Sequence, residues 1–147
     1  MKSHRITAVE AEAPLRLRLT WEDGRAGLVD LAAIVEGCPP LELLNDPELF
    51  ARARVGEWGW SVEWIEDELD LGTDQLRRWL DEQEGRIMPA GAFSKWRARM
   101  GMTLDSAAAA LGISRRMAAY YDSDTHPVPK TVWLATRAVE YERAASA

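Results

Sequence analysis

The chain of 147 residues is 47% hydrophobic and carries a net charge of −6, from 18 Lys and Arg against 24 Asp and Glu. This length and apolar content predict a globular protein of one ordinary domain or two small ones, and they exclude a chain too polar to form a core. The first twenty residues hold neither a signal peptide nor a membrane span, and the single cysteine, Cys38, excludes an internal disulfide or a cysteine-based zinc site, so we expect a cytoplasmic protein.

The beginning of the chain predicts a small antiparallel sheet. The segment from Ile6 to Glu12 predicts one strand, and apolar residues alternate with polar ones from Leu15 to Trp21, the period-2 pattern of a strand with one buried face. Asp23-Gly24 predicts a type I′ hairpin turn into a third strand within residues 25–31, because both central residues of that turn need positive φ.

The segment that follows predicts short elements separated by turns. Leu31 to Val35 favours a helix that ends at Gly37, and Pro39-Pro40 favours a loop. We expect Phe50 to Val55 and Ser61 to Ile65 to form strands, which would bring the sheet to about five strands.

Three tryptophans, Trp58, Trp60 and Trp64, flank and enter the strand expected from Ser61 to Ile65. Tryptophans in a small sheet are mostly core residues, because aromatic side chains dominate its buried area. If Trp58 is exposed, it would instead mark a surface that binds a protein or a small ligand.

We expect Thr73 to cap a helix with Leu76, Trp79 and Leu80 on its apolar stripe. The residues WEDG, GLVDL, NDPELF and VEWIEDELDLGTDQL resemble, in their order and spacing, the bacterial domain-of-unknown-function family 2442, over about residues 5–80. The resemblance implies an α+β fold, a small antiparallel sheet with one or two helices, and no particular activity. Some members of that family continue into a C-terminal helix-turn-helix.

The chain offers little for catalysis. His4 and His126 have no Cys, Ser or carboxylate at a spacing that suggests a partner, and the motifs GxGxxG, GxxxxGK[ST] and GxSxG are absent. Clustered acidic residues could bind a cation, but they lack the order of a calcium loop and favour a solvated loop. These residues are Glu63, Glu66, Asp67, Glu68, Asp70 and Asp74. We therefore predict no enzyme activity, no catalytic residue, no cofactor and no metal site.

Two glycines and a proline interrupt the periodicity from Glu84 to Gly91. We place the domain boundary there, between an acidic α+β domain at 1–86 and an all-α helix-turn-helix domain at 90–147. Residues 1–85 hold nine Lys and Arg against nineteen Asp and Glu, a net charge of −10, whereas residues 86–147 hold nine against five, a net charge of +4. The change of sign is expected of a DNA-binding module attached to a domain that does not bind DNA.

Residues 103–122 predict two short helices that meet at a glycine, the layout of a helix-turn-helix. Thr103 can cap the first helix, Gly112 supplies the left-handed residue that ends it, and Ser114 can cap the second. The first helix has mostly small apolar residues on one face, which let a second helix cross closely. These residues are Leu104, Ala107, Ala108 and Leu111.

The second helix predicts two different faces. One side gathers Arg115, Arg116, Ala119 and Tyr120, and the other, which we expect to pack, gathers Met117, Ala118 and Tyr121. Two arginines at the start of an exposed helical face are what reading of the DNA major groove needs, because their forked donors match guanine O6 and N7 or phosphate oxygens. The alternative is a solvated face on an ordinary helical hairpin.

From Phe93 onward the order FSKWRARMGMT, LDSAAAALGIS, RRMAAYYD, followed by a helix within residues 129–143, resembles the Xre/Cro-type helix-turn-helix family over about 50 residues. The resemblance implies a salt bridge between Arg97 and Asp122 that ties the helices together. By the same resemblance the base-reading positions fall on Arg115, Arg116 and Ala119, with Tyr120 beside them. Where many members carry a glutamine this chain has Leu104, so it departs from the family at that contact to DNA.

We expect residues 90–147 to bind double-stranded DNA as a homodimer, in a transcriptional regulator whose N-terminal domain senses a ligand, binds a protein partner or dimerises. The DNA-binding residues expected are Thr103, Ser114, Arg115, Arg116, Ala119 and Tyr120. The alternative is a non-catalytic, antitoxin-like interaction module whose helix-turn-helix no longer reads DNA. Leu104 and the overall acidity favour that alternative.

Overall fold

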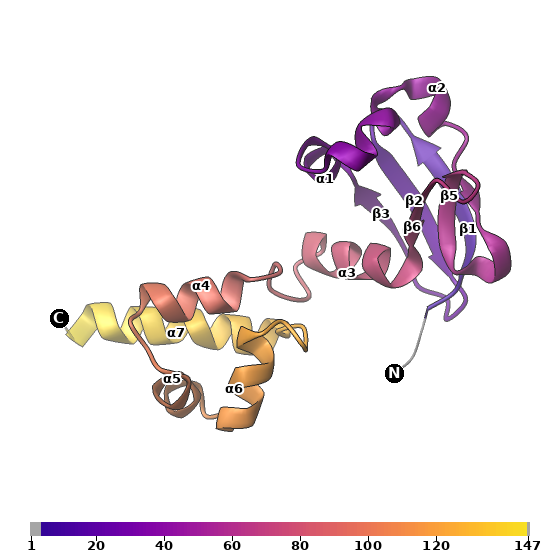
Figure 1. Ribbon diagram of the computed structural model, residues 1–147. Coiled ribbons are helices and arrows are strands. Elements are labelled where there is room, and N and C mark those ends of the chain that lie inside the picture. Colours follow the sequence, from indigo (N-terminus) through magenta and orange to yellow (C-terminus); the bar gives the residue numbers. More distant parts are fainter. Residues whose placement is uncertain (1–3, 147) are drawn as a thin grey trace. The chain divides into compact units, whose positions relative to one another are not determined.

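The computed structural model describes residues 4–146, and the chain divides into two compact units, residues 1–83 and 84–147. The first unit is an α+β unit with small antiparallel sheets, and the second consists of helices (Figure 1). Ile87 and Met88, which lie between the two predicted domains, are buried in the second unit, where Met88 N donates to Val128 O at 2.9 Å. The second unit therefore begins a few residues earlier than the predicted helix-turn-helix domain.

The first sheet has the order β1-β2-β3 and consists of β1 (Ile6–Glu12), β2 (Arg16–Trp21) and β3 (Ala26–Asp30), as predicted. Its β2–β3 turn differs from the prediction, because Gly24 has φ 90 but Asp23 has no positive φ. Trp21 N donates to Arg25 O at 2.8 Å, which leaves a three-residue loop with glycine at its left-handed last position. The type I′ turn was the wrong prediction.

Short helices follow, where a loop and a strand were predicted. After α1 (Ala32–Glu36), the two prolines begin a 3-10 helix, η1 (Pro39–Asn45), and α2 (Pro47–Phe50) comes next. The Asp46 carboxylate accepts a hydrogen bond from Glu48 N at 3.0 Å, so an N-cap followed by proline starts α2, which extends to the first residue of the predicted strand. The strand predicted from Phe50 to Val55 is therefore present only at its end, residues 54–55.

The second sheet has the order β4-β5-β6. Its strands are β4 (Arg54–Val55), β5 (Ser61–Ile65) and β6 (Leu69–Gly72), with a short 3-10 turn, η2 (Glu57–Gly59), between the first two. Residues 4–146 thus contain six strands in two sheets, against about five expected in one. Of the acidic residues, Glu66, Asp67 and Glu68 form the exposed turn of the β5–β6 hairpin, as the predicted solvated loop requires. Glu63 and Asp70 are instead paired strand residues, and Asp74 lies in α3.

The last helix of the first unit, α3 (Thr73–Gln83), closes the core. Leu76 and Leu80 are fully buried and join the inward side chains of both sheets in one apolar cluster, as their stripe predicted. Figure 1 shows α1 and α2 at one end of the strands and α3 at the other.

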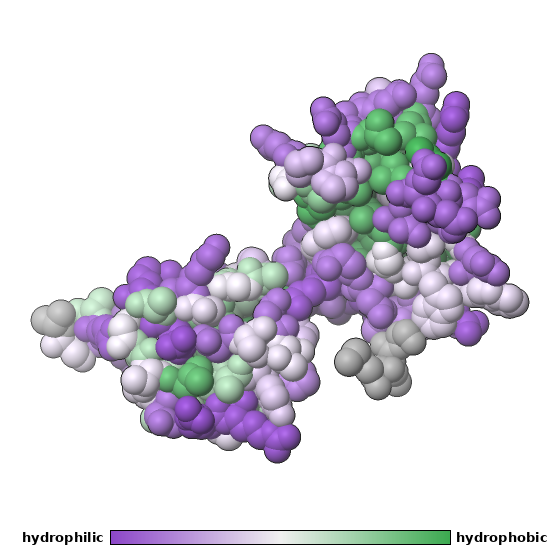
Figure 2. Space-filling view, in the orientation of Figure 1, coloured by the Kyte–Doolittle hydropathy of each residue, from purple (hydrophilic) through white to green (hydrophobic). Residues whose placement is uncertain are grey.

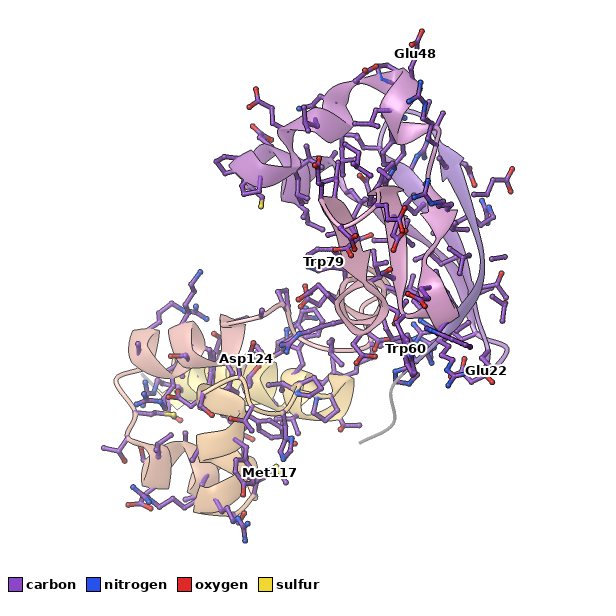
Figure 3. All side chains as sticks on the ribbon, turned by 45° about the vertical axis from the view of Figure 1, so that its right-hand side comes forward. Glu22, Glu48, Trp60, Trp79, Met117 and Asp124 are labelled. Atoms are coloured by element: carbon purple, nitrogen blue, oxygen red, sulfur yellow. The ribbon has the colours of Figure 1, made fainter. Side chains whose placement is uncertain are left out.

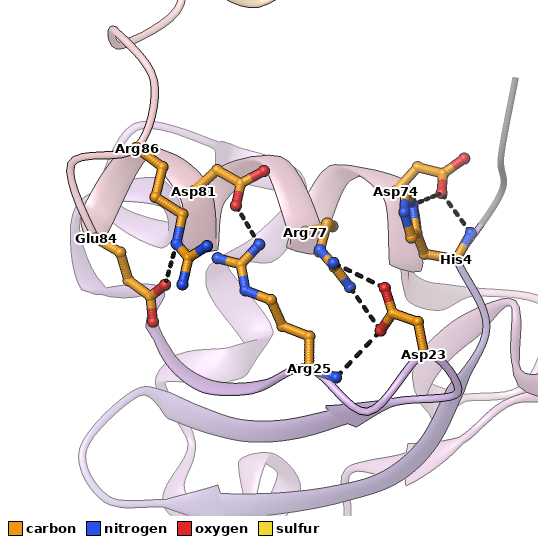
Figure 4. A network of polar contacts seen from close by, with 8 residues as sticks. All are labelled: His4, Asp23, Arg25, Asp74, Arg77, Asp81, Glu84 and Arg86. Atoms are coloured by element: carbon orange, nitrogen blue, oxygen red, sulfur yellow. Dashed lines mark hydrogen bonds and ion pairs between the residues drawn. The ribbon is translucent and has the colours of Figure 1, made fainter. Parts of the chain in front are cut away.

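Ion pairs fasten the polar side of α3 to the β2–β3 hairpin (Figure 4). Arg77 donates two hydrogen bonds to Asp23, at 3.2 and 2.9 Å, and Asp81 lies 2.5 Å from Arg25. The hydrogen bond from Arg77 lowers the pKa of Asp23 to about 2, and a second bond from Arg25 N acts in the same direction. The hairpin loop is therefore held by charge as well as by packing.

The second unit contains four helices, α4 (Ala92–Arg99), α5 (Leu104–Leu111), α6 (Arg115–Asp122) and α7 (Lys130–Ser146), within residues 84–146. Its core is aromatic: Phe93 lies 5.6 Å from Trp96 and 5.7 Å from Tyr121, measured between ring centroids. Small Ala107 and Ala118 are fully buried where α5 packs against α6. This packing leaves the outer side of α6 open to solvent.

Candidate nucleic-acid interface

Two helix caps and a left-handed glycine, all three predicted from the sequence, set the ends of the helices in the α5–turn–α6 segment. Thr103 Oγ1 accepts from Ser106 N at 3.1 Å while Ser106 Oγ accepts from Thr103 N at 2.9 Å, a reciprocal capping box. Gly112 has φ 70 and ψ 30, the left-handed conformation that ends α5. Ser114 Oγ then accepts from Met117 N at 3.1 Å and starts α6. These contacts confirm the predicted caps and set the position of Arg115.

The two faces of α6 are separated as predicted. Ala118 and Tyr121 are buried, and Met117 is half-buried. On the other side Arg115 and Arg116 are exposed, while Ala119 and Tyr120 are half-buried. The helix therefore presents two guanidinium groups at its N-terminal end from a body that is locked by packing.

Arg116 is held by Tyr120, which in turn packs against His126. The Arg116 guanidinium donates through Nε to Tyr120 Oη at 2.8 Å and lies over the ring, with Cζ 5.4 Å from the centroid. His126 packs edge-on against that ring at 4.6 Å, and its backbone N donates to Tyr120 O. Sequence reasoning assigned no partner to His126, because its contact depends on how the α6–α7 loop folds back.

Arg115 has a partner that the sequence did not reveal. Its Nε lies 3.1 Å from Asp105 Oδ1, and the two side chains are 65% and 77% exposed. Asp105 belongs to the first turn of α5, so this ion pair bridges the starts of α5 and α6. A carboxylate therefore stands within the group of side chains expected to bind DNA.

Arg97 and Asp122 are in contact and join α4 to the end of α6. Arg97 Nε donates to Asp122 Oδ1 at 2.6 Å and Nη2 to Oδ2 at 3.2 Å, while Nη1 donates to Met102 O at 2.9 Å. The hydrogen bond to Asp122 raises the pKa of Arg97 above its ordinary value. The side chains are 25% and 21% exposed, so most of each one is shielded from water.

The structure limits what Thr103 and Leu104 can contribute to DNA binding. The Thr103 side chain is exposed, but its hydroxyl is engaged with Ser106. Leu104 is half-buried at the start of α5 and can offer only apolar contact to a ligand. The polar groups available around α6 therefore belong mainly to Arg115, Arg116, Tyr120 and Asp105.

The N-terminal unit presents a separate surface of aromatic side chains. Trp58 is 73% exposed and has φ 61 and ψ 9, a conformation that few bulky residues adopt. Trp60 is 39% exposed, and Arg5 Cζ lies 4.8 Å from the centroid of its ring (Figure 3). Trp64 is buried and stacks on Phe50 at 5.8 Å, so one of the three tryptophans is core.

A pocket of about 330 Å³ lies in the N-terminal unit between the β1–β2 turn and α2. Its walls are mostly small or rigid side chains, and apolar residues are exposed over this end of the unit (Figure 2). Asn45 contributes the one side-chain amide among the lining residues, which are Ala11, Ala13, Pro14, Leu15, Asn45, Pro47, Phe50 and Ala51.

Two kinds of feature are absent over residues 4–146. In that range no group of three or more His, Cys, Asp or Glu side chains is arranged to hold a metal ion. None of the helices described there has both the length and the apolar character needed to cross a membrane.

Comparison with known proteins adds two findings. Residues 6–82 match the family model described as "Protein of unknown function (DUF2442)". The chain is also similar to a crystal structure named "Putative DNA Binding Protein NE0471", from Nitrosomonas europaea ATCC 19718, with 42% sequence identity and a TM-score of 0.57 over 92% of this chain and 88% of that one. None of the curated proteins matches the chain.

Proposed function

This chain belongs to the DUF2442 family of unknown function, and from its C-terminal unit we propose that it is a DNA-binding transcriptional regulator of the Xre/Cro helix-turn-helix type. The observation that carries the proposal is the orientation of α6. Arg115 and Arg116 project from the start of a helix whose opposite face is packed against α4 and α5. A rigid helix with exposed arginines at its N-terminal end suits the major groove, where guanine offers two acceptors to a guanidinium.

Charge and similarity support the same proposal. Residues 86–147 carry a net charge of +4, which favours approach to phosphates even though the whole chain is acidic. The similar protein from Nitrosomonas europaea is named for DNA binding, and its 42% identity extends over 92% of this chain. We carry that property over to this chain as part of the proposal.

In the proposed complex, Arg115, Arg116 and Tyr120 approach base edges, and the helix-cap residues Thr103 and Ser114 lie near the phosphates. A single unit of this size makes few contacts, so specific binding requires a homodimer on a palindromic site. The N-terminal unit has one of three roles: it binds a protein partner through the exposed surface around Trp58 and Trp60, it senses a ligand, or it dimerises. The protein catalyses no reaction.

The second candidate function is a non-catalytic interaction module whose helix-turn-helix no longer reads DNA. Asp105 favours it, because this carboxylate pairs with Arg115 and would repel phosphates. Leu104 favours it as well, since a half-buried leucine offers no hydrogen bond to a phosphate or base. Under this alternative, α6 would contact another protein.

Selection from a randomised duplex pool tests the proposal. The full-length protein is incubated with the pool at about 50 mM salt, and shifted DNA is recovered and sequenced. We expect a palindrome with half-site centres about 34–36 Å apart, on one face of the duplex. A protein that shifts no member of the pool would reject the regulator and leave the interaction module.

A further inference from the structure

The ion pair between Asp105 and Arg115 joins the first turns of α5 and α6 on an open surface. Both side chains are well over half exposed, and an ion pair so open to water contributes little to folding stability. Asp105 nevertheless lies beside an arginine at the point where α6 would enter the major groove. A carboxylate in that position weakens attraction to any phosphate, so its presence is better explained by recognition of the base sequence.

The contact leaves free the side-chain atoms of Arg115 and Asp105 that could hydrogen-bond to bases. Its shortest distance joins Arg115 Nε to Asp105 Oδ1 at 3.1 Å, and within residues 4–146 the terminal Nη1 and Nη2 atoms and the second oxygen, Oδ2, make no hydrogen bond. The two terminal nitrogens of a guanidinium match guanine O6 and N7, and a carboxylate oxygen accepts from cytosine N4. The pair therefore offers two donors and one acceptor side by side.

Building on the DNA binding proposed above, we propose that Asp105 is a specificity-determining residue that reads a G·C base pair jointly with Arg115. Arg115 donates its terminal N–H groups to guanine, and Asp105 accepts from the cytosine amino group beside it in the major groove. An A·T pair also has two acceptors and one donor, but its donor lies between the acceptors, so it does not match two adjacent donors followed by a carboxylate and leaves one member of the pair unsatisfied.

The same ion pair lowers binding to DNA of the wrong sequence. Phosphate oxygens cannot satisfy Asp105, and its negative charge offsets that of Arg115 near the backbone. Arg116 is held separately by Tyr120 at 2.8 Å, so it remains available for backbone or base contact. Asp105 thus reduces non-specific affinity and increases the difference between the correct site and all others.

The test compares Asp105→Asn with two controls in the full-length protein. Asp105→Glu keeps the charge, and Glu142→Gln removes one charge from an exposed side chain of α7. For each variant, the dissociation constant for a random-sequence duplex is measured at about 50 mM salt, and base preference is obtained by selection from a randomised pool. Thermal unfolding verifies that each variant folds.

We expect Asp105→Asn to bind the random duplex about 3- to 10-fold more tightly and to lose about 5-fold or more of its G·C preference at one base pair per half-site. Asp105→Glu should retain most of that preference, and Glu142→Gln should change neither quantity by more than about twofold. If Asp105→Asn behaves like Glu142→Gln in both measurements, or weakens all sequences alike, the joint reading is wrong while DNA binding stands. If the unmodified protein binds no DNA, both proposals fail.

Discussion

Arg97 on α4 donates two hydrogen bonds to Asp122 at the end of α6, from Nε to Oδ1 at 2.6 Å and from Nη2 to Oδ2 at 3.2 Å. The same guanidinium donates to Met102 O at 2.9 Å, in the connection between α4 and α5. One side chain therefore ties together three consecutive parts of the helical unit. Because α6 carries the two exposed arginines, this tie also fixes the surface proposed to meet DNA.

Breaking this contact should destabilise the helical unit moderately. We expect the coupling energy between Arg97→Ala and Asp122→Ala to be about 1–2 kcal/mol, between the values typical of exposed and buried pairs, because the side chains are 25% and 21% exposed. A double-mutant cycle by chemical denaturation measures it. The ion pair of Arg99 with Glu140, which is 64% and 39% exposed, is the matched control and should couple by about 0–1 kcal/mol. Equal coupling in the two cycles would refute this ranking.

Asp23 should titrate far below an ordinary aspartate. Its pKa is lowered to about 2 by hydrogen bonds from Arg77 and from Arg25 N. A group whose pKa is lower in the folded state stabilises the protein above its unfolded pKa, so this contribution is present at neutral pH and is lost as the pH falls from about 4 to about 2.

The Asp23 carboxyl can be followed by NMR titration in the unmodified protein and in Arg77→Ala. We expect the pKa to rise towards about 4 in Arg77→Ala, since the largest cause of the shift is removed. Arg78→Ala, one position along α3, should leave it near 2. A pKa that stays low in Arg77→Ala would show that the arginine is not the cause.

Replacing Gly59 by alanine should destabilise the protein more than replacing Gly24, although both glycines have positive φ. At Gly59, with φ 79, an added Cβ would lie 2.6 Å from Ile6 O in β1, whereas at Gly24, with φ 90, it would meet nothing within 4 Å. We expect Gly24→Ala to cost about 1–2 kcal/mol from backbone strain alone, and Gly59→Ala to cost about 1–3 kcal/mol more. Urea denaturation of the two variants measures the difference, and equal losses would mean that η2 moves away from β1 at little cost.

The two units should behave as separate folding units, with the connecting segment most open to proteolysis. Trypsin should cut first after Arg86, whose side chain is exposed in the segment between α3 and α4. Mass spectrometry of a digestion time course identifies the first fragments. First cleavage after Arg52 or Arg54, with Arg86 protected, would contradict the division.

Local patterns in the sequence predict much of this fold. The alternation from Leu15 to Trp21 predicts β2, and the 3.6-residue period with Gly112 and two cap residues predicts α5 and α6. These signals succeed because each depends on residues within a few positions of one another. Asp46 and Pro47 misled the prediction, because the same two residues that suit a turn also start α2.

Contacts between elements were harder to predict. The strand β6 has leucines on either side of Asp70, but the surrounding acidic residues concealed that alternation. The pairing of Asp105 with Arg115 depends on how α5 crosses α6, and the packing of His126 on Tyr120 depends on the path of a loop. Contacts between separate elements leave no periodic pattern in the sequence. The arginines of the site were therefore predicted, but their partners were not.

The most direct test of the central claim is the DNA affinity of the full-length protein after both exposed arginines of α6 are removed. For the duplex enriched from the random pool, Arg115→Ala combined with Arg116→Ala should weaken binding at least about tenfold at 50–200 mM salt. Arg52→Ala combined with Arg54→Ala removes the same charge from exposed side chains of the N-terminal unit, and its affinity should stay within about twofold of the unmodified protein. Equal dissociation constants for the two double variants would contradict the assignment of DNA binding to α6.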